Sequence, residues 1–327
     1  MGCSALCPVW IGYALFVSDP AAMSPPSKPA APNRRVMISV RGLVKRFDGR
    51  AVLAGVDLDI YAGEIMVVMG GSGCGKSTFL RCLIGSYAID EGCVSMFGKN
   101  LTDLDEGGMD EVRKRFGILF QSSALFNSMT IAENVALPLR EHTDLDESTI
   151  STIVKIKLEQ VNLREHADKY PAQLSGGMRK RAGLARAMAL DPKILFYDEP
   201  SAGLDPVTSA EIDQLILSLT KKLGVTSVVV THEMDSAFAI ADRMVMLDKG
   251  RVLRVDTREW FDKLRTLPQA EASALPEDTQ IIRQFLRGDA EGPITARRSA
   301  SNFAEDLLGG SGDLPSTPSV EATRSRG

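Results

Sequence analysis

The chain of 327 residues lacks an apolar stretch long enough to cross a bilayer, which takes about 20 residues. The longest candidate, residues 5–17, contains Pro8 and Gly12, and no Lys or Arg precedes it as in a signal peptide. The myristoylation pattern fails as well, because position 6 is Leu. We therefore expect a flexible start to the chain, with a membrane-touching N-terminus as the alternative.

Paired cysteines and an excess of basic residues are also missing. The five cysteines are odd in number and have no metal-site spacing, so reduced thiols are the simplest account. Lys and Arg number 38 against 42 Asp and Glu, a formal net charge of -4. A nucleic-acid partner is therefore not expected, although local basic clusters remain open. Hydrophobic residues make up 44%, which is enough for a sizeable core.

Order is expected to begin near Met37, after a Pro-rich linker at 24–32. Buried or alternating apolar runs predict strands over 38–47, 52–60, 64–69, 116–120, 194–197, 227–230, 243–247 and 251–255. Helical patterns cover 76–84, 146–160, 178–190 and 207–223, and residues 130–170 are mostly helical. This alternation predicts an α/β fold with a mainly parallel sheet. The first strands have no helix between them and predict an antiparallel β part.

A glycine-rich turn between a predicted strand and a predicted helix fits the phosphate-binding pattern G-x-x-x-x-G-K-[ST]. Its glycines let backbone N–H groups wrap phosphates, and the helix N-terminus adds positive charge. Lys76 would reach the β- and γ-phosphates, and Ser77 would ligate Mg²⁺. The candidate ATP-binding residues here are Gly70, Gly71, Ser72, Gly73, Cys74, Gly75, Lys76, Ser77 and Thr78.

The predicted strand 194–197 ends in two acids, Asp198 and Glu199. Ligands of open α/β sheets bind at the carboxyl ends of strands. Asp198 would hold Mg²⁺, and Glu199 would orient and deprotonate the attacking water. Alone the pair is a weak signal, but it follows the phosphate-binding turn in the expected order.

Ser175, Gly176 and Gly177 precede a basic helix within the sequence Leu-Ser-Gly-Gly-Met. A hydroxyl, two small residues and a helix N-terminus suit an anion. In isolation, the same pattern is also a plain helix cap. Together with the preceding motifs, it resembles the signature of ABC transporter ATPases, a P-loop NTPase cassette with a helical subdomain. The resemblance covers about residues 38–256 and implies a head-to-tail homodimer that sandwiches two ATP molecules.

Further roles follow from the resemblance. Gln121 resembles the glutamine that senses Mg²⁺ and contacts the membrane partner, and Asp205 lies in the family's D-loop. His232 resembles the switch histidine, so Lys76, Glu199 and His232 form the implied catalytic set. Phe47 lies where the family stacks an aromatic ring on adenine, with a core Phe as the alternative. The implied Mg²⁺ ligands are Ser77, Gln121 and Asp198.

We expect a disordered extension at 1–36, an ATP-binding domain at 37–260 with its helical subdomain at about 122–185, a C-terminal extension at 261–295 and a disordered tail at 296–327. The extension is a candidate dimer contact through Arg283, Phe285 and Leu286, and the alternative is a surface amphipathic helix.

Met178 stands where most ABC ATPases have Gln, and Met-Arg-Lys-Arg resembles the Mla- or Mce-associated ATPases. That subfamily energises phospholipid movement, which implies permease subunits, an Mce-type substrate-binding protein and a site at the cytoplasmic face of the inner membrane. An importer of an amino acid or ion is the alternative. A non-transport ABC ATPase is the alternative of another class, but the interval from Gln121 to Leu174 leaves no room for a long coiled coil.

Two residues of the phosphate-binding turn depart from common patterns. Gly71 stands where many family members have Pro, which should relax the turn without removing a phosphate contact. Cys74 lies beside Lys76 and a helix N-terminus, which can lower the pKa of a thiol. A redox-sensitive Cys74 is therefore one hypothesis, and a tolerated small residue is the other.

Overall fold

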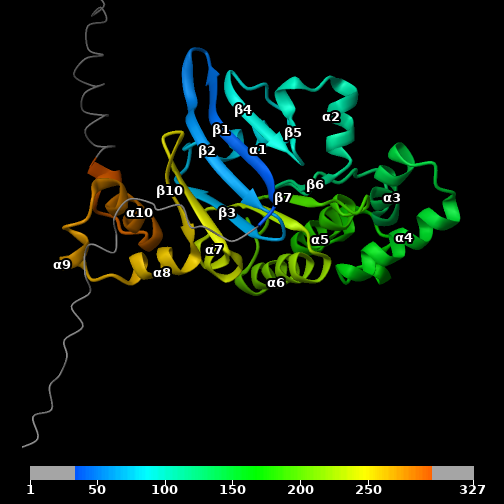
Figure 1. Ribbon diagram of the computed structural model, residues 1–327. Coiled ribbons are helices and arrows are strands. Elements are labelled where there is room, and N and C mark those ends of the chain that lie inside the picture. Colours follow the sequence, from blue (N-terminus) through cyan, green and yellow to red (C-terminus); the bar gives the residue numbers. More distant parts are fainter. Residues whose placement is uncertain (1–33, 297–327) are drawn as a thin grey trace, which may run out of the picture. The chain divides into compact units, whose positions relative to one another are not determined.

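The computed structural model describes residues 34–296, so the predictions for the two chain ends lie almost wholly outside the described residues (Figure 1). Within this part the chain forms two β-sheets and ten α-helices. The α/β prediction, with an antiparallel β part at its start and a mainly parallel core sheet, is confirmed.

The first sheet is antiparallel and has the strand order β2-β1-β4-β5. Its long strand β2 largely alternates buried with more exposed residues, as expected for a sheet with one face on the core. Strand β1 has the buried neighbours Met37–Ile38 and Leu43–Val44 where its pairing with β2 shifts register. The strands are β1 Val36–Phe47, β2 Arg50–Tyr61, β4 Glu91–Met96 and β5 Lys99–Asn100.

The second sheet has the order β10-β9-β3-β8-β7-β6, and its neighbours pair in parallel except for β9 and β10. Strands β3 and β8 are buried along their whole length, which is why they read as unbroken apolar runs. The strands are β3 Ile65–Gly70, β6 Phe116–Leu119, β7 Ile194–Asp198, β8 Thr226–Val230, β9 Arg243–Asp248 and β10 Arg251–Thr257.

The main core lies between the two sheets and around helix α1 (Lys76–Leu83), which contacts strands of both. Helices α6 (Pro206–Leu223), α7 (Met234–Ile240) and α8 (Arg258–Thr266) contact strands of the second sheet and lie beneath it in Figure 1. Helix α2 (Glu106–Arg113) contacts β6.

A helical region follows β6 and consists of α3 (Ile131–His142), α4 (Glu147–Gln160) and α5 (Gly176–Ala187), which contact one another. Side chains cap the start of each: Thr130 forms a capping box, and Asp146 and Ser175 accept backbone N–H bonds. This region projects to the right in Figure 1.

The chain continues past β10 with α8, α9 (Gln269–Ala272) and α10 (Glu277–Arg287). Buried Arg283 holds this extension together, because it donates to the Gln269 side chain at 2.6 Å and to the Leu267 carbonyl at 2.8 Å. Gln284 is also buried, and it accepts from the N–H of Ile294 at 2.7 Å.

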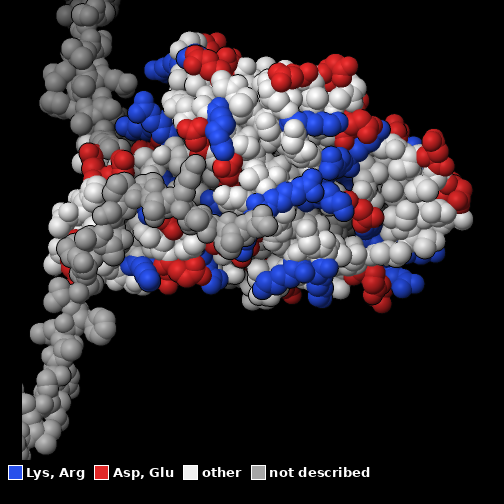
Figure 2. All heavy atoms as spheres, viewed as in Figure 1, with Lys and Arg blue, Asp and Glu red and all other residues white. Residues whose placement is uncertain are grey.

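Several short elements were not predicted: β4, β5, α2, α7, α8 and α9. Gly92 interrupts the strand pattern of β4, and α7 is only seven residues long. Within residues 34–296, no helix is both long and apolar enough to span a membrane. The face in Figure 2 carries both signs of charge, with Lys and Arg gathered across its middle, so local basic clusters exist despite the net charge of -4.

Candidate functional site

The phosphate-binding turn connects β3 to α1 and fits tightly between neighbouring strands. Gly70 (φ 155°) and Gly75 (φ 110°) adopt backbone conformations that favour glycine. A Cβ on Gly70 would lie 2.3 Å from the Leu247 carbonyl oxygen, and one on Gly75 would lie 2.9 Å from Leu53. Gly71 is different, because its φ is not positive and a Cβ would meet nothing within 4 Å. The turn therefore requires glycine at positions 70 and 75.

Lys76 opens α1 and folds its buried side chain back over the turn. Its Nζ donates to the Gly70 carbonyl at 2.8 Å and to the Gly71 carbonyl at 3.0 Å. An ammonium has three N–H donors, so these two bonds fix its direction and leave donor capacity for an anion. The positive end of α1 and the Lys76 charge together favour phosphate.

Glu199 follows β7 and is tied to His232, which follows β8. Oε1 of Glu199 lies 2.8 Å from Nδ1 of His232, and the His232 backbone N–H lies 3.4 Å from Oε2. The Glu199 side chain is 12% exposed, whereas that of His232 is 60% exposed. Glu199 also has a left-handed backbone (φ 49°), which is uncommon for a residue with a side chain. The structure thus holds this carboxylate in one orientation.

Asp198 lies at the end of β7, beside Glu199. Burial raises the pKa of its carboxyl, repulsion from Glu199 raises it further, and the nearby Arg81, Lys180 and Lys76 charges oppose the rise. A carboxylate whose charge is disfavoured by burial and by a neighbouring carboxylate suits a bound cation.

One pocket of about 730 Å³ brings together most of the predicted phosphate-side residues. This volume falls in the usual range for small-molecule sites. The predicted residues that line it are Gly70, Gly71, Ser72, Gly73, Cys74, Lys76, Ser77, Gln121, Glu199 and His232. The predicted residues outside its lining are Phe47, Gly75, Thr78, Ser175, Gly176, Gly177, Asp198 and Asp205.

Some lining residues were not predicted. Met246, Asp248 and Lys249 come from the end of β9, which pairs with β3 and therefore ends beside the turn. Their position at the end of a predicted strand could have identified them from the sequence as candidate site residues. Phe285, which the sequence predicted only as a candidate dimer contact, and Ile294 come from the C-terminal extension.

Phe47 and Asp205 lie outside the lining of this pocket. Phe47 is 39% exposed and packs against Tyr87 with ring centroids 5.3 Å apart, so it is not a core residue. Asp205 caps α6: Oδ1 accepts from the Val207 and Thr208 N–H groups at 3.1 Å. The hydrogen bond from the Thr208 hydroxyl is the main cause that lowers the pKa of its carboxyl, and these backbone N–H bonds lower it further.

Ser175 is exposed and caps α5, accepting from the Met178 N–H at 3.3 Å. Gly177 lies against α6 of the same chain, because a Cβ there would come within 2.3 Å of the Thr208 Cγ2 atom. The signature glycines thus have a packing role within the chain that the sequence did not indicate.

The structure opposes an activated Cys74. Its thiol is buried, and burial raises its pKa, although the Lys76 charge works in the other direction. The thiolate is therefore disfavoured, contrary to the redox hypothesis, because the sequence revealed the neighbouring charge but not the burial.

Arg283 and Leu286 are buried, while Phe285 is partly exposed and borders the pocket. Of the three candidate dimer-contact residues, only Phe285 therefore presents a side chain to its surroundings.

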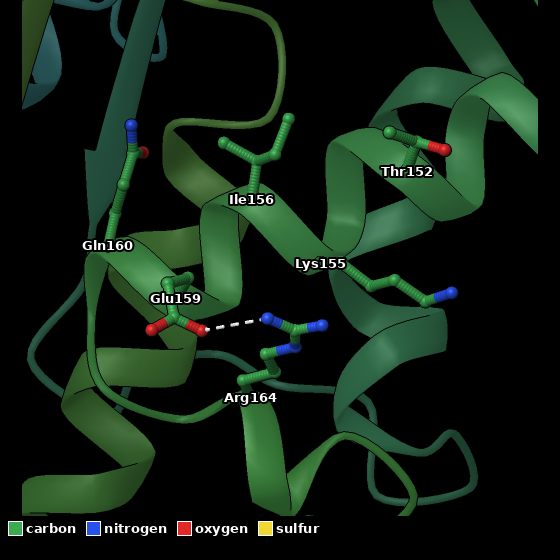
Figure 3. A pocket seen from close by; sticks show the side chains of 6 residues that line it. All are labelled: Thr152, Lys155, Ile156, Glu159, Gln160 and Arg164. Atoms are coloured by element: carbon green, nitrogen blue, oxygen red, sulfur yellow. Dashed lines mark ion pairs between the residues drawn. The ribbon is translucent and has the colours of Figure 1, made fainter.

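A second hollow, of about 420 Å³, lies on α4 and is unrelated to these motifs (Figure 3). It is lined by Thr152, Lys155, Ile156, Glu159, Gln160 and Arg164. Glu159 and Arg164 form an exposed ion pair at 3.5 Å, so their charges are directed at each other. None of the predicted site residues lines this hollow.

Comparison with known proteins agrees with this geometry. The ABC transporter family matches residues 53–202. The chain is 39% identical to the "Intermembrane phospholipid transport system ATP-binding protein MlaF" of Escherichia coli strain K12, over 84% of this chain and 97% of that protein. It is 41% identical to the "Probable ribonucleotide transport ATP-binding protein mkl" of Mycobacterium leprae, over 83% of this chain and 75% of that protein.

Solved structures agree as well. A dimeric post-hydrolysis ATP-binding cassette bound to ADP and Pi matches with a TM-score of 0.63 and 32% identity, over 68% of this chain and 99% of that one. The cassette cbiO1 of Clostridium perfringens matches with a TM-score of 0.65 and 29% identity, over 72% of this chain and 98% of that one.

Proposed function

The chain belongs to the ABC transporter family of ATP-hydrolysing ATP-binding subunits, and on that premise we propose that it energises phospholipid transport through a separate membrane permease. The observation that carries the proposal is the similarity to a phospholipid transport ATPase along 97% of that relative's length. Met178 in the signature, where most ABC ATPases have Gln, supports the same subfamily.

In the proposed mechanism, the N–H groups of the turn and Lys76 bind the phosphates of ATP. Glu199 accepts a proton from the attacking water, and the Nδ1 contact at 2.8 Å from His232 keeps its carboxylate oriented. The exposed edge of His232 lines the same pocket and is available to the γ-phosphate. Positioning and charge stabilisation supply most of the catalysis.

The residues present also fit Mg²⁺, which neutralises phosphate charge in such sites. Ser77 is exposed in the first turn of α1, and the pKa of Asp198 is raised by burial and then by the neighbouring Glu199. Mg²⁺ typically uses one or two carboxylates plus substrate phosphates. We assign Ser77, Asp198 and Gln121 as the residues that would hold it.

We further propose that two copies form a head-to-tail dimer, in which the exposed Ser175 of one copy completes the site of the other. Phe285, at the edge of the pocket, is the candidate through which the C-terminal extension meets the second copy. The permease places the dimer on the cytoplasmic face of the inner membrane, with an Mce-type protein as a further partner. Phe47 is the candidate adenine contact.

Import of a small solute is the alternative, and the similarity to the mycobacterial relative named for ribonucleotide transport favours keeping it. Detergent pull-down of the chain from its native membranes, with proteins and lipids identified by mass spectrometry, separates the two. We expect a permease, an Mce-type protein and enriched phospholipid. A different permease with a soluble solute-binding protein would contradict phospholipid transport and retain the ATPase.

Glu199→Gln tests the catalytic assignment. The substitution keeps the shape and removes the base, so we expect unchanged ATP binding and roughly a 100-fold or greater loss of turnover. Steady-state ATP hydrolysis and equilibrium binding of a fluorescent ATP analogue measure the two quantities. Normal hydrolysis by this variant would rule out Glu199 as the base.

A further inference from the structure

Lys180 lies in the second turn of α5, five residues after Ser175, and its side chain is directed into the protein. The residue is only 5% exposed. A buried ammonium is costly unless its N–H groups find acceptors and its charge is compensated. Lys180 therefore requires specific partners, and the ATPase mechanism described above does not use it.

Its partners are two backbone carbonyls of the active site. Nζ of Lys180 donates to the Gln121 carbonyl at 2.7 Å and to the Glu199 carbonyl at 3.0 Å. Gln121 follows β6 and Glu199 follows β7, two adjacent strands of the second sheet. One side chain thus joins the loop of the Mg²⁺-sensing glutamine to the loop of the proposed base.

The charges around Lys180 suit this bridge. Asp198, Glu199 and Glu233 all interact favourably with its charge and partly offset the cost of burial. Glu199 has the uncommon φ of 49°, which persists only where surrounding contacts hold it. The Glu199 N–H donates to the Val230 carbonyl at 2.9 Å. The Glu199 carbonyl accepts the Lys180 bond at 3.0 Å and a longer bond from the Ala202 N–H at 3.3 Å, so Lys180 provides the shorter of the two contacts on the carbonyl side.

We propose that Lys180 is a positioning residue that holds Gln121 and Glu199 in their working geometry and couples both to the signature helix α5. Ser175 caps the start of that helix, and Lys180 is one turn further along it. A shift of α5 therefore moves the carbonyls of both loops, and with them the side chains that act on the γ-phosphate side. This inference rests on the proposed role of Glu199.

Lys180→Met tests the proposal in the full-length chain with Mg-ATP. Methionine fills the space without a donor, so the Gln121 carbonyl loses its Lys180 donor and the Glu199 carbonyl keeps only the longer bond from the Ala202 N–H at 3.3 Å. The backbone at Glu199 is then held less firmly. Small displacements of this kind can cost about 100-fold in rate. We expect kcat to fall at least tenfold, while KM and the affinity for a fluorescent ATP analogue stay unchanged, because Lys180 does not touch the phosphate-binding turn.

Lys180→Arg keeps a cation with enough donors for both carbonyls, and we expect it to restore most of the kcat. Lys157→Met is the matched control. Lys157 is also buried, at 4% exposure, but pairs with Asp191 at 2.5 Å in the helical region. It contacts neither loop, so its loss should lower thermal stability without a selective loss of kcat.

Normal kcat in Lys180→Met, or a parallel loss of ATP affinity and kcat as in a destabilised protein, would overturn the proposal. If Lys180→Met does not fold, Lys180→Gln, a shorter neutral donor, replaces it and should give an intermediate kcat at unchanged affinity. Glu199→Gln is measured beside these variants. Should Glu199→Gln be inactive and the Lys180 variants normal, only this inference fails; normal hydrolysis by Glu199→Gln refutes the proposed base itself.

Discussion

At the scale of single residues, the phosphate-binding turn separates glycines that are required from one that is not. Gly70 passes so close to β9 that a Cβ would lie 2.3 Å from the Leu247 carbonyl oxygen. Gly71 has open space where its Cβ would be. The pattern G-x-x-x-x-G-K-[ST] requires glycine at position 70 and accepts any residue at position 71. The space around each backbone position explains this difference.

The pair Gly70→Ala and Gly71→Ala makes this contrast measurable. We expect Gly71→Ala to bind ATP normally and to change stability by no more than about 0.5 kcal/mol. Gly70→Ala should lose ATP binding, because the backbone carbonyl of Leu247 cannot yield without distorting the turn. Isothermal titration with ATP and urea unfolding are the measurements. Equal behaviour of the two variants would contradict the proposed crowding at Gly70.

Cys74 gives a prediction about pH. Burial raises the pKa of its thiol, so at any pH below that value the folded chain holds less thiolate than the unfolded chain does. We therefore expect slow alkylation of Cys74 in the native state, accelerating only as the pH rises through the elevated pKa. Iodoacetamide labelling followed by mass spectrometry checks this, with the partly exposed Cys93 as an internal reference. Fast labelling of Cys74 at neutral pH would restore the redox hypothesis.

At the scale of elements, α5 and α6 meet at a point where only a hydrogen atom fits. The Cβ that Gly177 lacks would lie 2.3 Å from Cγ2 of Thr208 and 3.8 Å from its Cβ. Thr208 is itself fixed, since its hydroxyl donates to Asp205 at 2.6 Å in the cap of α6. Helix α5 and the first turn of α6 are therefore in direct steric contact within one chain.

Gly177→Ala should destabilise the protein by about 1–3 kcal/mol, as overpacking typically does. Thr208→Ser removes only the offending Cγ2 and keeps the hydroxyl, so the double variant should recover most of that loss. Chemical unfolding of the single and double variants gives the coupling energy. Additive effects in the double variant would place the strain elsewhere.

Helices and strands whose sequence has a strong periodicity or a continuous apolar run were predictable. Elements that form because of contacts with neighbouring strands and helices were not. Strand β3 reads as an apolar run because both of its faces are covered. Strand β4 has alternating burial only after Gly92, so its pairing with β1, rather than its own sequence pattern, makes this segment a strand. Helix α7 has seven residues, too few for a periodic pattern to stand out.

The residues of the candidate site were predictable or not for the same reason. Residues in ordered motifs were found because backbone geometry demands particular residue types in sequence. Lys180 and Ile294 were missed as site residues, and Phe285 was predicted only as a dimer contact. All three reach the site through the tertiary fold, from the second turn of a helix and from the C-terminal extension. Nothing in their local sequence records that approach.

At the scale of the whole molecule, Arg243 on β9 ties the two sheets together. Its Nη1 donates to the Asp59 carbonyl on β2 at 3.0 Å and to Glu64 Oε1 at 3.0 Å. Its guanidinium also lies 4.9 Å from the ring centroid of Tyr61. Because the Glu64 side chain is 1% exposed, this ion pair is largely shielded from solvent.

Arg243→Met should cost about 3–5 kcal/mol of unfolding free energy, since it leaves the Glu64 charge buried without its ion-pair partner. Arg113→Met is the control: Arg113 forms exposed ion pairs with Glu106 and Asp110, which contribute about 1 kcal/mol at most. Urea unfolding measures both. Adding Glu64→Gln to Arg243→Met should restore part of the loss, and equal costs for the two arginines would refute the link between the sheets.

The wall that Phe285 and Ile294 add to the ATP pocket has a pharmacological consequence. The phosphate-binding turn lies within residues 53–202, the region that the ABC transporter family matches, whereas these two side chains lie outside it. An inhibitor that touches only the turn contacts the region that this chain shares with its family. One that extends to Phe285 meets a surface peculiar to chains with this extension, and that difference in contacts is a route to selectivity.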